Sequence, residues 1–312
     1  MHRRISTYSS SYIIEYLKVD LSGGKRIELI LKDLSPSSLL LTADRIRPHF
    51  LYDPRREIRT YRHILRTARD NTPQFYGAFE SNDLERYWLF LERVSGPLLW
   101  QAEGMDPWKD AARWLARLHE GFYSVGQGTL DSSVGHLLRY DRQFLEVWLI
   151  RAEEFLKHKH RLHDLAALRR FGQIANRYDR VVKRLLDLPA SFIHREFYPS
   201  NIIMRKKPRN RAICPVDWEL AAIGPSLMDL AALTSGEWSV EARRAMVTAY
   251  RETISQVPGG LPTLDEMMEH VEYCQLHLAV QFMGWAPDWS PPERHSQNWL
   301  REAIRLGEKL GL

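Results

Sequence analysis

Residues 194–201 read His-Arg-Glu-Phe-Tyr-Pro-Ser-Asn, and Asp217 follows 16 residues after Asn201 within the run Val-Asp-Trp-Glu. Between them lie two short apolar runs on either side of a basic turn at 206–210. This pattern predicts a β-hairpin with Asn201 at its entrance and Asp217 at its exit. The two side chains are therefore expected to converge on one cation.

The residue types at these positions indicate phosphate chemistry. An amide oxygen and a carboxylate are hard ligands that suit Mg²⁺ carrying phosphates rather than zinc. Glu196, five residues before Asn201, is placed to accept a proton from an attacking hydroxyl group. A base followed by an Asn ligand and an Asp ligand is the order found in kinase catalytic loops.

With these residues the chain resembles the aminoglycoside phosphotransferase/choline kinase-like family of small-molecule kinases. That family's pattern is H-x-D-x-x-x-x-N, then a D-W-E-like segment, then D-L-A. The matching positions here are His194, Pro199, Asn201, Asp217-Trp218-Glu219 and Asp229-Leu230-Ala231. The resemblance implies an α+β, two-lobed protein-kinase-like fold. We expect an N-lobe at 1–94, a small antiparallel sheet with one main helix, and a larger, mostly helical C-lobe at 95–312.

Patterning along the chain agrees with that expectation. Runs 12–19 and 26–32, joined by Leu-Ser-Gly-Gly at 21–24, predict an antiparallel hairpin. We expect a helix at 54–65 and two more strands at 74–79 and 87–91. Ser95-Gly96-Pro97 is the predicted lobe boundary, and the sequence after it favours helices at 108–120, 143–158, 162–186 and from 227 onward, interrupted by extended segments at 191–193 and 202–216.

Further site residues follow from the resemblance alone. It implies that Lys32 contacts the ATP phosphates and that Glu57 holds Lys32 by an ion pair. It also implies that Asp229 braces the catalytic loop and that His194 does the same by hydrogen bonding. The nucleotide-binding set it implies is Lys32, Glu57, Ser9 and Ser10 in the phosphate-covering loop, and Glu92 and Val94 in the hinge that reads adenine.

Two positions depart from the family's pattern. Glu196 stands where the catalytic Asp is expected, and its extra methylene moves the carboxylate by up to about 1.5 Å. Glu196 is thus a slow base, a sound base on a slightly withdrawn backbone, or a relic; taken alone, it would pair with Arg195 or another arginine. The loop at 6–11 lacks the expected glycines.

These observations support two hypotheses of different classes. The first is an ATP- or GTP- and Mg²⁺-dependent phosphotransferase that acts on a hydroxyl of an aminoglycoside, sugar or amino alcohol. The second is a pseudokinase, which binds nucleotide or acts as a scaffold without turnover. A protein kinase is disfavoured, because Tyr198 replaces the usual lysine and only eleven residues separate Asp217 from Asp229.

The acceptor site is less defined by the sequence. Segment 284–289, Gly-Trp-Ala-Pro-Asp-Trp, could line it or pack within the C-lobe. Four acidic residues would suit a polyamine acceptor and equally an exposed helix face. They are Asp265, Glu266, Glu269 and Glu272.

Composition excludes several other classes of protein. The 312 residues include 44 Lys and Arg against 39 Asp and Glu, a net charge of +5 that is scattered along the chain and gives little support to nucleic-acid binding. No run approaches the ~18 apolar residues of a membrane-spanning helix, and no apolar run follows the basic N-terminus as in a secretory signal. The two cysteines are expected to be free thiols. We therefore expect a cytoplasmic protein whose partners are a nucleotide and a small hydroxyl acceptor, with no nucleic acid or membrane.

Overall fold

The computed structural model describes residues 2–6, 11–66, 71–126, 134–158, 164–206, 211–285 and 298–312. Its contacts divide the chain into two compact units. The first comprises Met1–Ala102, Leu130–Leu137 and Pro199–Ala221, and the second comprises Glu103–Thr129, Leu138–Tyr198 and Ala222–Leu312. The division of function between 1–94 and 95–312 stays a prediction.

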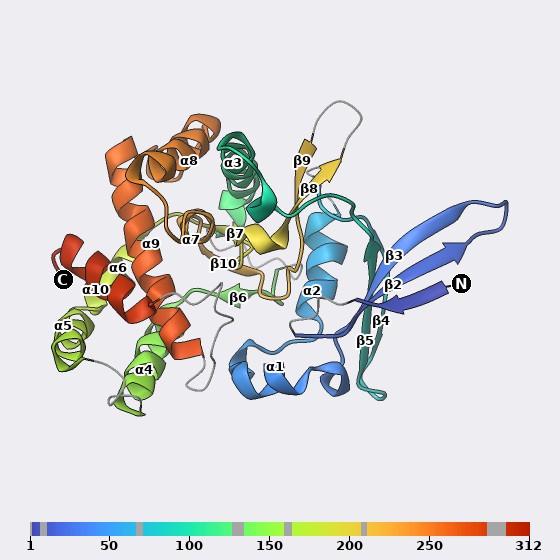
Figure 1. The fold of residues 1–312 in the computed structure, drawn as a ribbon, viewed down its shortest axis with the longest axis horizontal. Coiled ribbons are helices and arrows are strands. Elements are labelled where there is room, and N and C mark those ends of the chain that lie inside the picture. The colour runs from blue at the N-terminus through green and yellow to red at the C-terminus, as the bar shows by residue number, and fades with distance from the viewer. Residues whose placement is uncertain are drawn as a thin grey trace. The chain divides into compact units, whose positions relative to one another are not determined.

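The first unit is built on a five-stranded antiparallel sheet with the order β1-β2-β3-β5-β4 (Figure 1). Its strands are β1 (His2–Ile5), β2 (Ile14–Asp20), β3 (Arg26–Asp33), β4 (Phe75–Ser81) and β5 (Arg86–Glu92). The predicted hairpin is confirmed as β2 and β3, paired from Ile14 opposite Lys32 to Asp20 opposite Arg26. Gly23 and Gly24 form its turn with φ of 93° and 77°, values that glycine adopts without steric cost.

Two short helical segments accompany this sheet. α1 (Leu41–Ile46), between β3 and α2, was not predicted. The helix expected at 54–65 begins at Arg56 as α2 (Arg56–Arg59) and continues as a π-helical turn over Thr60–Leu65. The apolar spacing of three and four residues is compatible with both helix types, so the sequence could not separate them.

A second hairpin completes the first unit and confirms the prediction for 202–216. β8 (Ile202–Lys206) pairs antiparallel with β9 (Arg211–Pro215). The predicted boundary segment runs along β8, because the Met204 N–H donates to the Pro97 carbonyl at 2.8 Å and the Lys206 N–H to the Ser95 carbonyl at 3.3 Å. Gly96 must be glycine there, since a Cβ would lie 2.8 Å from the Met204 carbonyl carbon.

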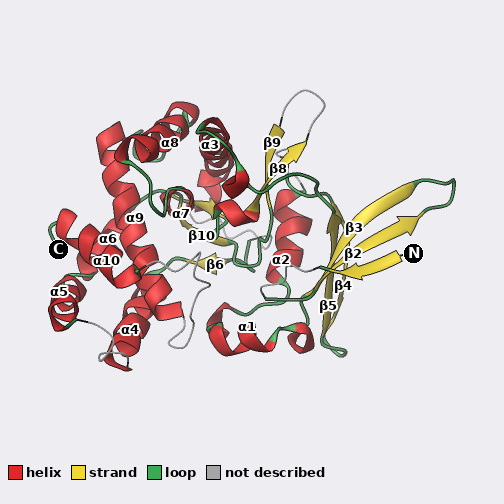
Figure 2. Ribbon diagram, in the orientation of Figure 1, coloured by secondary structure: helices red, strands yellow, loops and turns green. Residues whose placement is uncertain are grey.

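The second unit is mostly helical, as Figure 2 shows in red. Long α9 packs against α4, α7 and α10, while α3 packs against α8 and the small strand β7. The helices are α3 (Asp106–Gly126), α4 (Arg142–His158), α5 (Leu165–Ala175), α6 (Asp179–Asp187), α7 (Leu227–Leu233), α8 (Val240–Thr253), α9 (Leu264–Trp285) and α10 (Trp299–Lys309). No helix among the described residues is long and apolar enough to span a bilayer.

Two details of the second unit differ from the sequence prediction. The single helical stretch expected at 162–186 is broken into α5 and α6, and the buried Tyr178 at the break donates or accepts a 2.7 Å hydrogen bond with His277 Nδ1. A three-stranded sheet with the order β6-β10-β7 joins β6 (Leu138–Arg139), β10 (Ala222–Pro225) and β7 (Ala190–Ile193). β6 and β10 are too short to leave a periodic signal in the sequence.

Candidate functional site

The first unit gathers a buried ion-pair network around Lys32. Lys32 Nζ lies 2.7 Å from Glu57 Oε2 and 2.5 Å from Asp217 Oδ1. The other Glu57 oxygen accepts the backbone N–H of Trp218 at 3.1 Å. β3, α2 and the end of the second hairpin therefore meet at one ammonium group, although Lys32 and Asp217 are 185 residues apart in sequence.

The charges of this network depend on one another. Burial lowers the pKa of Lys32, but the carboxylates of Asp217 and Glu57 outweigh it and the pKa is raised. Lys32 is therefore a cation in the folded protein. Glu57 is 1% exposed, and burial raises the pKa of its carboxyl group against the opposing effect of Lys32.

The hairpin places Asn201 and Asp217 at its two ends. The Val216 N–H donates to the Asn201 carbonyl at 2.9 Å, which extends the β8–β9 pairing by one step. Asp217 has a φ of +69°, a left-handed conformation that is costly for a residue other than glycine and is often found at functional sites. Its side chain is 27% exposed.

These residues fit a magnesium ion by the chemistry of their donors. Mg²⁺ is usually held by one or two carboxylates, with the remaining ligands from phosphates and water. Glu219, two residues beyond Asp217, offers a second carboxylate whose buried Oε2 has no hydrogen-bond partner among the described residues. Within the described ranges, no group of three or more His, Cys, Asp or Glu side chains could hold a metal ion.

Sequence reasoning missed the partner of Glu219. Arg47, directly after α1, forms an ion pair with Glu219 Oε1 and donates to Ser11 Oγ at 2.9 Å. Both charged side chains are nearly buried, at 8% and 9% exposure. The sequence motif Asp-Trp-Glu could have identified Glu219 as a site residue. No motif or periodic pattern near Arg47 identifies it as the partner of Glu219.

The other predicted nucleotide-binding residues do not contact the Lys32 network in the part of the chain that the structure describes. Glu92 ends β5, and both of its carboxylate oxygens accept from Arg205 on β8, at 3.0 and 3.1 Å. Val94 follows that strand and is half-buried. Ser9 and Ser10 lie outside the described residues.

The second unit holds a separate cluster around Asp229 on α7. The fully buried Asp229 carboxylate accepts the backbone N–H groups of His194 and Arg195, each at 2.7 Å. The carboxylate also lies 3.3 Å from Nε2 of His119. The other ring nitrogen of His119, Nδ1, lies 2.9 Å from the Tyr250 hydroxyl. Two charge-assisted bonds to consecutive amides fix the loop directly before Glu196.

The conformation of the loop bears on the predicted ion pair between Glu196 and Arg195. The Arg195 guanidinium is buried among aromatic rings, and Nη1 and Nη2 have no hydrogen-bond partner among the described residues. The predicted ion pair of Glu196 with Arg195 is therefore wrong, whereas its pairing with another arginine stays a prediction. The Glu196 N–H donates to His194 Nδ1 at 3.3 Å, so His194 contacts the loop that it was predicted to support.

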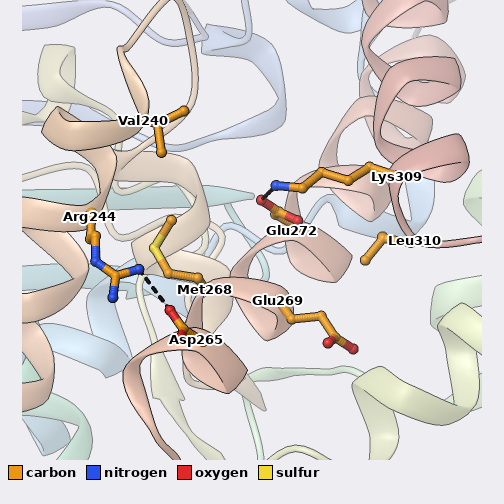
Figure 3. Close-up of a pocket in the computed structure, with 8 residues that line it drawn as sticks. All are labelled: Val240, Arg244, Asp265, Met268, Glu269, Glu272, Lys309 and Leu310. Atoms are coloured by element: carbon orange, nitrogen blue, oxygen red, sulfur yellow. Dashed lines mark hydrogen bonds and ion pairs between the residues drawn. The ribbon is translucent and has the colours of Figure 1, made fainter.

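The acidic residues of α9 have partners within the protein. An open pocket of about 420 Å³ lies beside α9. Figure 3 shows its lining residues, among which Arg244 pairs with Asp265 and Lys309 with Glu272. Glu269 lies 3.7 Å from Arg184, and Glu266 accepts from Thr263 at the start of the helix. Three of these carboxylates are thus paired with cations on α8, α10 and α6, which is typical of ion pairs between neighbouring helices at the surface rather than of a polyamine site.

The predicted site residues thus fall into two clusters. Lys32, Glu57 and Asp217 are brought together in the first unit, which also holds Asn201, and the loop of His194 and Glu196 is tied to Asp229 in the second. The spacing of the motif at 194–219 predicted Glu196, Asn201 and Asp217, whereas Lys32, Glu57, His194 and Asp229 followed from the family resemblance. The cation at Arg195 was not assigned a function by sequence reasoning.

Solved structures of kinases share this fold. The GDP complex of wild-type aminoglycoside 2'-phosphotransferase-IIIa aligns with a TM-score of 0.59 at 14% identity, covering 99% of this chain and 92% of that chain. Plasmodium vivax ethanolamine kinase gives 0.58 at 14%, covering 98% and 82%. A microcompartment-associated aminopropanol kinase gives 0.51 at 15%, covering 98% and 89%. At such identities these similarities establish the predicted α+β kinase-like fold.

Sequence comparison carries the assignment further. No curated protein matches the chain significantly. The profile of the phosphotransferase enzyme family, however, matches residues 18–269, which include the Lys32 strand, the loop at 194–201 and Asp229. Because this match spans most of the chain and runs through both clusters, the chain belongs to the phosphotransferase enzyme family.

Proposed function

We propose that the protein transfers the γ-phosphate of ATP or GTP, with Mg²⁺, to a hydroxyl group of a small molecule. The observation that carries this proposal is the contact of Lys32 with both Glu57 and Asp217. Kinase catalysis requires a lysine held by a helix glutamate, together with an aspartate that binds the metal. The contacts of Lys32 with the other two side chains within one unit support this assignment of roles.

We expect the positively charged residue of the site to bind phosphate and the oxygen donors to bind the metal. Lys32, kept cationic by its carboxylate partners, would bind the nucleotide phosphates. Asn201 and Asp217 would hold Mg²⁺, with Glu219 as a further oxygen donor. Bound there, the ion would neutralise charge on the phosphates during transfer. Asp217 is paired with Lys32 in the structure, so metal binding would compete with that ion pair.

Glu196 would act on the acceptor. Its carboxylate would orient the hydroxyl group and accept its proton, as the catalytic-loop aspartate does in kinases. The loop before it is held by Asp229, which supports a defined position for this base. The contacts of Lys32 with Glu57 and Asp217 give no support to the pseudokinase alternative.

The class of acceptor is proposed from the relatives. Structures with this fold are named as aminoglycoside, ethanolamine and aminopropanol kinases. Each of these names describes a molecule with both an amine and a hydroxyl group. We propose an amino alcohol or an amino sugar as the acceptor.

Two measurements test the proposal. The first is thermal unfolding with ADP, ATP, GDP and GTP, each with and without Mg²⁺; a ligand at 100 times its Kd stabilises by about 2.7 kcal/mol. The second is acceptor-dependent release of nucleoside diphosphate, with ethanolamine, choline, aminopropanol and aminoglycosides as acceptors. We expect a Mg²⁺-dependent stabilisation by at least one nucleotide and turnover with at least one acceptor.

Three variants separate the roles. Asp217→Asn should remove the Mg²⁺-dependent part of the stabilisation, whereas Asp20→Asn, an exposed aspartate paired with Arg26, should not. Glu196→Gln should keep nucleotide binding and lose about 10²–10⁴-fold in turnover. A wild-type protein that binds no nucleotide under any condition would overturn the proposed function.

A further inference from the structure

The residue before Glu196 is a buried cation, and no ion pair is found for it within the described part of the chain. Arg195 is 1% exposed, and its Nε donates to the Tyr140 hydroxyl at 3.2 Å. Its two terminal nitrogens are buried and make no hydrogen bond among the described residues. A desolvated guanidinium is costly unless something else in the protein stabilises it.

Three aromatic side chains provide that stabilisation; we call them the aromatic cage. The Arg195 Cζ lies 5.3 Å from the ring centroid of Phe144, 5.7 Å from Trp148 and 5.8 Å from Trp285. Phe144 and Trp148 are one helical turn apart on α4, and Trp285 is the last residue of α9, stacked on Trp148 with an interplanar angle of 2°. Cation–π contacts are strongest where the cation is desolvated, as it is here.

The backbone of Arg195 is restrained at the same time. Its φ is +72°, in the left-handed region, and its N–H is held by Asp229. A non-glycine residue keeps such a conformation only where its surroundings enforce it. Asp229 on α7 holds the backbone, and the aromatic cage on α4 and α9 holds the side chain.

We propose that Arg195 is a positioning residue, whose caged guanidinium fixes the backbone from which Glu196 projects. The proposal rests on the proposed role of Glu196 as the base. A glutamate carries its carboxylate up to about 1.5 Å further from the backbone than an aspartate. Because an error of about 1 Å in placement can cost about 10²-fold in rate, the longer base requires a firmly set backbone.

The first test needs no turnover. Hydrogen–deuterium exchange is followed by mass spectrometry in peptides covering 191–201, for wild type, Arg195→Met, Arg195→Lys and Arg180→Met. Methionine keeps the length of the side chain without its charge, and lysine keeps the charge. Arg180 is the control, because it also donates to a main-chain carbonyl, that of Gly311 at 3.1 Å, but from α6 and outside the aromatic cage.

We expect Arg195→Met to speed exchange of the loop amides by at least about tenfold, through the loss of cation–π contacts at a desolvated site. Arg195→Lys should stay near wild type, and Arg180→Met should leave the loop unchanged. Exchange in the α3 and α8 peptides reports whether each variant is folded.

If Arg195→Met folds poorly, a second variant is used. Tyr140→Phe removes only the hydrogen bond to Arg195 Nε, and it should still speed exchange of the loop amides. Unaltered loop exchange in Arg195→Met, or in Tyr140→Phe where it is used, overturns the proposal.

The second test uses phosphate release from Mg²⁺–ATP or Mg²⁺–GTP, with water as the acceptor. Arg195→Met should lower kcat by about 10²-fold and leave the KM for nucleotide nearly unchanged, with recovery in Arg195→Lys. Glu196→Asp should also cost much less in the Arg195→Met background than in wild type, because the two residues act as one unit. Additive effects would contradict a positioning role. Absence of both this release and acceptor-dependent turnover in the wild type counts against the proposed function, whereas the exchange experiment still decides the role of Arg195.

Discussion

Lys32 Nζ lies 2.5 Å from Asp217 Oδ1, so the residue expected to hold phosphate and the residue expected to hold metal are paired with each other. The contact joins β3 to the end of the β8–β9 hairpin. It keeps Lys32 charged while this residue is 7% exposed, and its partner Asp217 has a left-handed backbone conformation. The pair therefore contributes to folding as well as to the proposed binding of Mg²⁺–nucleotide.

Removal of Lys32 should destabilise the protein without any ligand. Lys32→Met leaves the buried Glu57 carboxylate without its cation, at a cost of about 3–5 kcal/mol in unfolding free energy. Lys32→Met/Glu57→Gln should recover much of this loss, because no unpaired charge remains at Glu57. Urea unfolding at neutral pH measures both variants.

Lys18→Met is the control for this experiment. Lys18 lies on the adjacent strand β2 and pairs with Glu28 at 3.1 Å, but its side chain is 47% exposed. An exposed pair contributes less than about 1 kcal/mol. Equal losses in Lys18→Met and Lys32→Met would show that burial of the Lys32 network has no energetic consequence.

Asp229 should be among the most sensitive positions of the second unit. Asp229→Asn places an amide group where a carboxylate now accepts two backbone N–H groups, so one donor is left facing another donor. We expect a loss of about 2–4 kcal/mol in unfolding free energy, since bonds to charged acceptors contribute about 1.5–3 kcal/mol each. Asp164→Asn, at the exposed N-cap of α5, should change stability little because both residues cap helices well. Comparable losses at the two positions would argue against a bracing role.

Local patterns in the sequence were sufficient for much of the fold. Alternation at 26–32 and the Gly23-Gly24 turn predict the β2–β3 hairpin, and the motif spacing predicts the β8–β9 hairpin with Asn201 and Asp217 at its ends. Each of these features depends on residues close together in sequence. The ion pair of Lys32 with Glu57 came from the family resemblance, because no local pattern distinguishes a buried strand lysine from a solvated one.

What escaped prediction depends on contacts between distant segments. The Arg47–Glu219 pair joins residues 172 positions apart, in a segment with no periodic pattern. The Arg195 side chain enters the aromatic cage only because α4 and α9 lie side by side. The break between α5 and α6 likewise follows from burial of Tyr178 against His277. Local propensity has no information on such packing.

Gly96 provides a steric test of the segment that runs along β8. Gly96→Ala would overlap the Met204 carbonyl and disturb the hydrogen bonds made by Ser95 and Pro97, at a cost of about 1–3 kcal/mol. Gly77→Ala on β4 has no atom within 4 Å of the new methyl group and should be nearly neutral. Urea unfolding compares the two variants, and a neutral Gly96→Ala would contradict this close approach.

His277 should make the protein sensitive to acid. Burial, with a further effect from the charge of Arg195, lowers the pKa of His277 to about 3. The unfolded chain binds a proton at this residue below about pH 6.5, whereas the folded chain does not until the pH approaches 3. The stabilising contribution of neutral His277 to the free energy of unfolding is therefore complete above pH 6.5 and is lost as the pH is lowered toward 3. At pH 5 this loss amounts to about 2 kcal/mol. His277→Gln, whose amide oxygen can accept from the Tyr178 hydroxyl, should lose about 2 kcal/mol less than wild type between pH 7.5 and pH 5 in urea unfolding. Above pH 7.5 the two proteins should show the same pH dependence, and an equal acid loss in both would show that His277 is not the buried neutral histidine of this site.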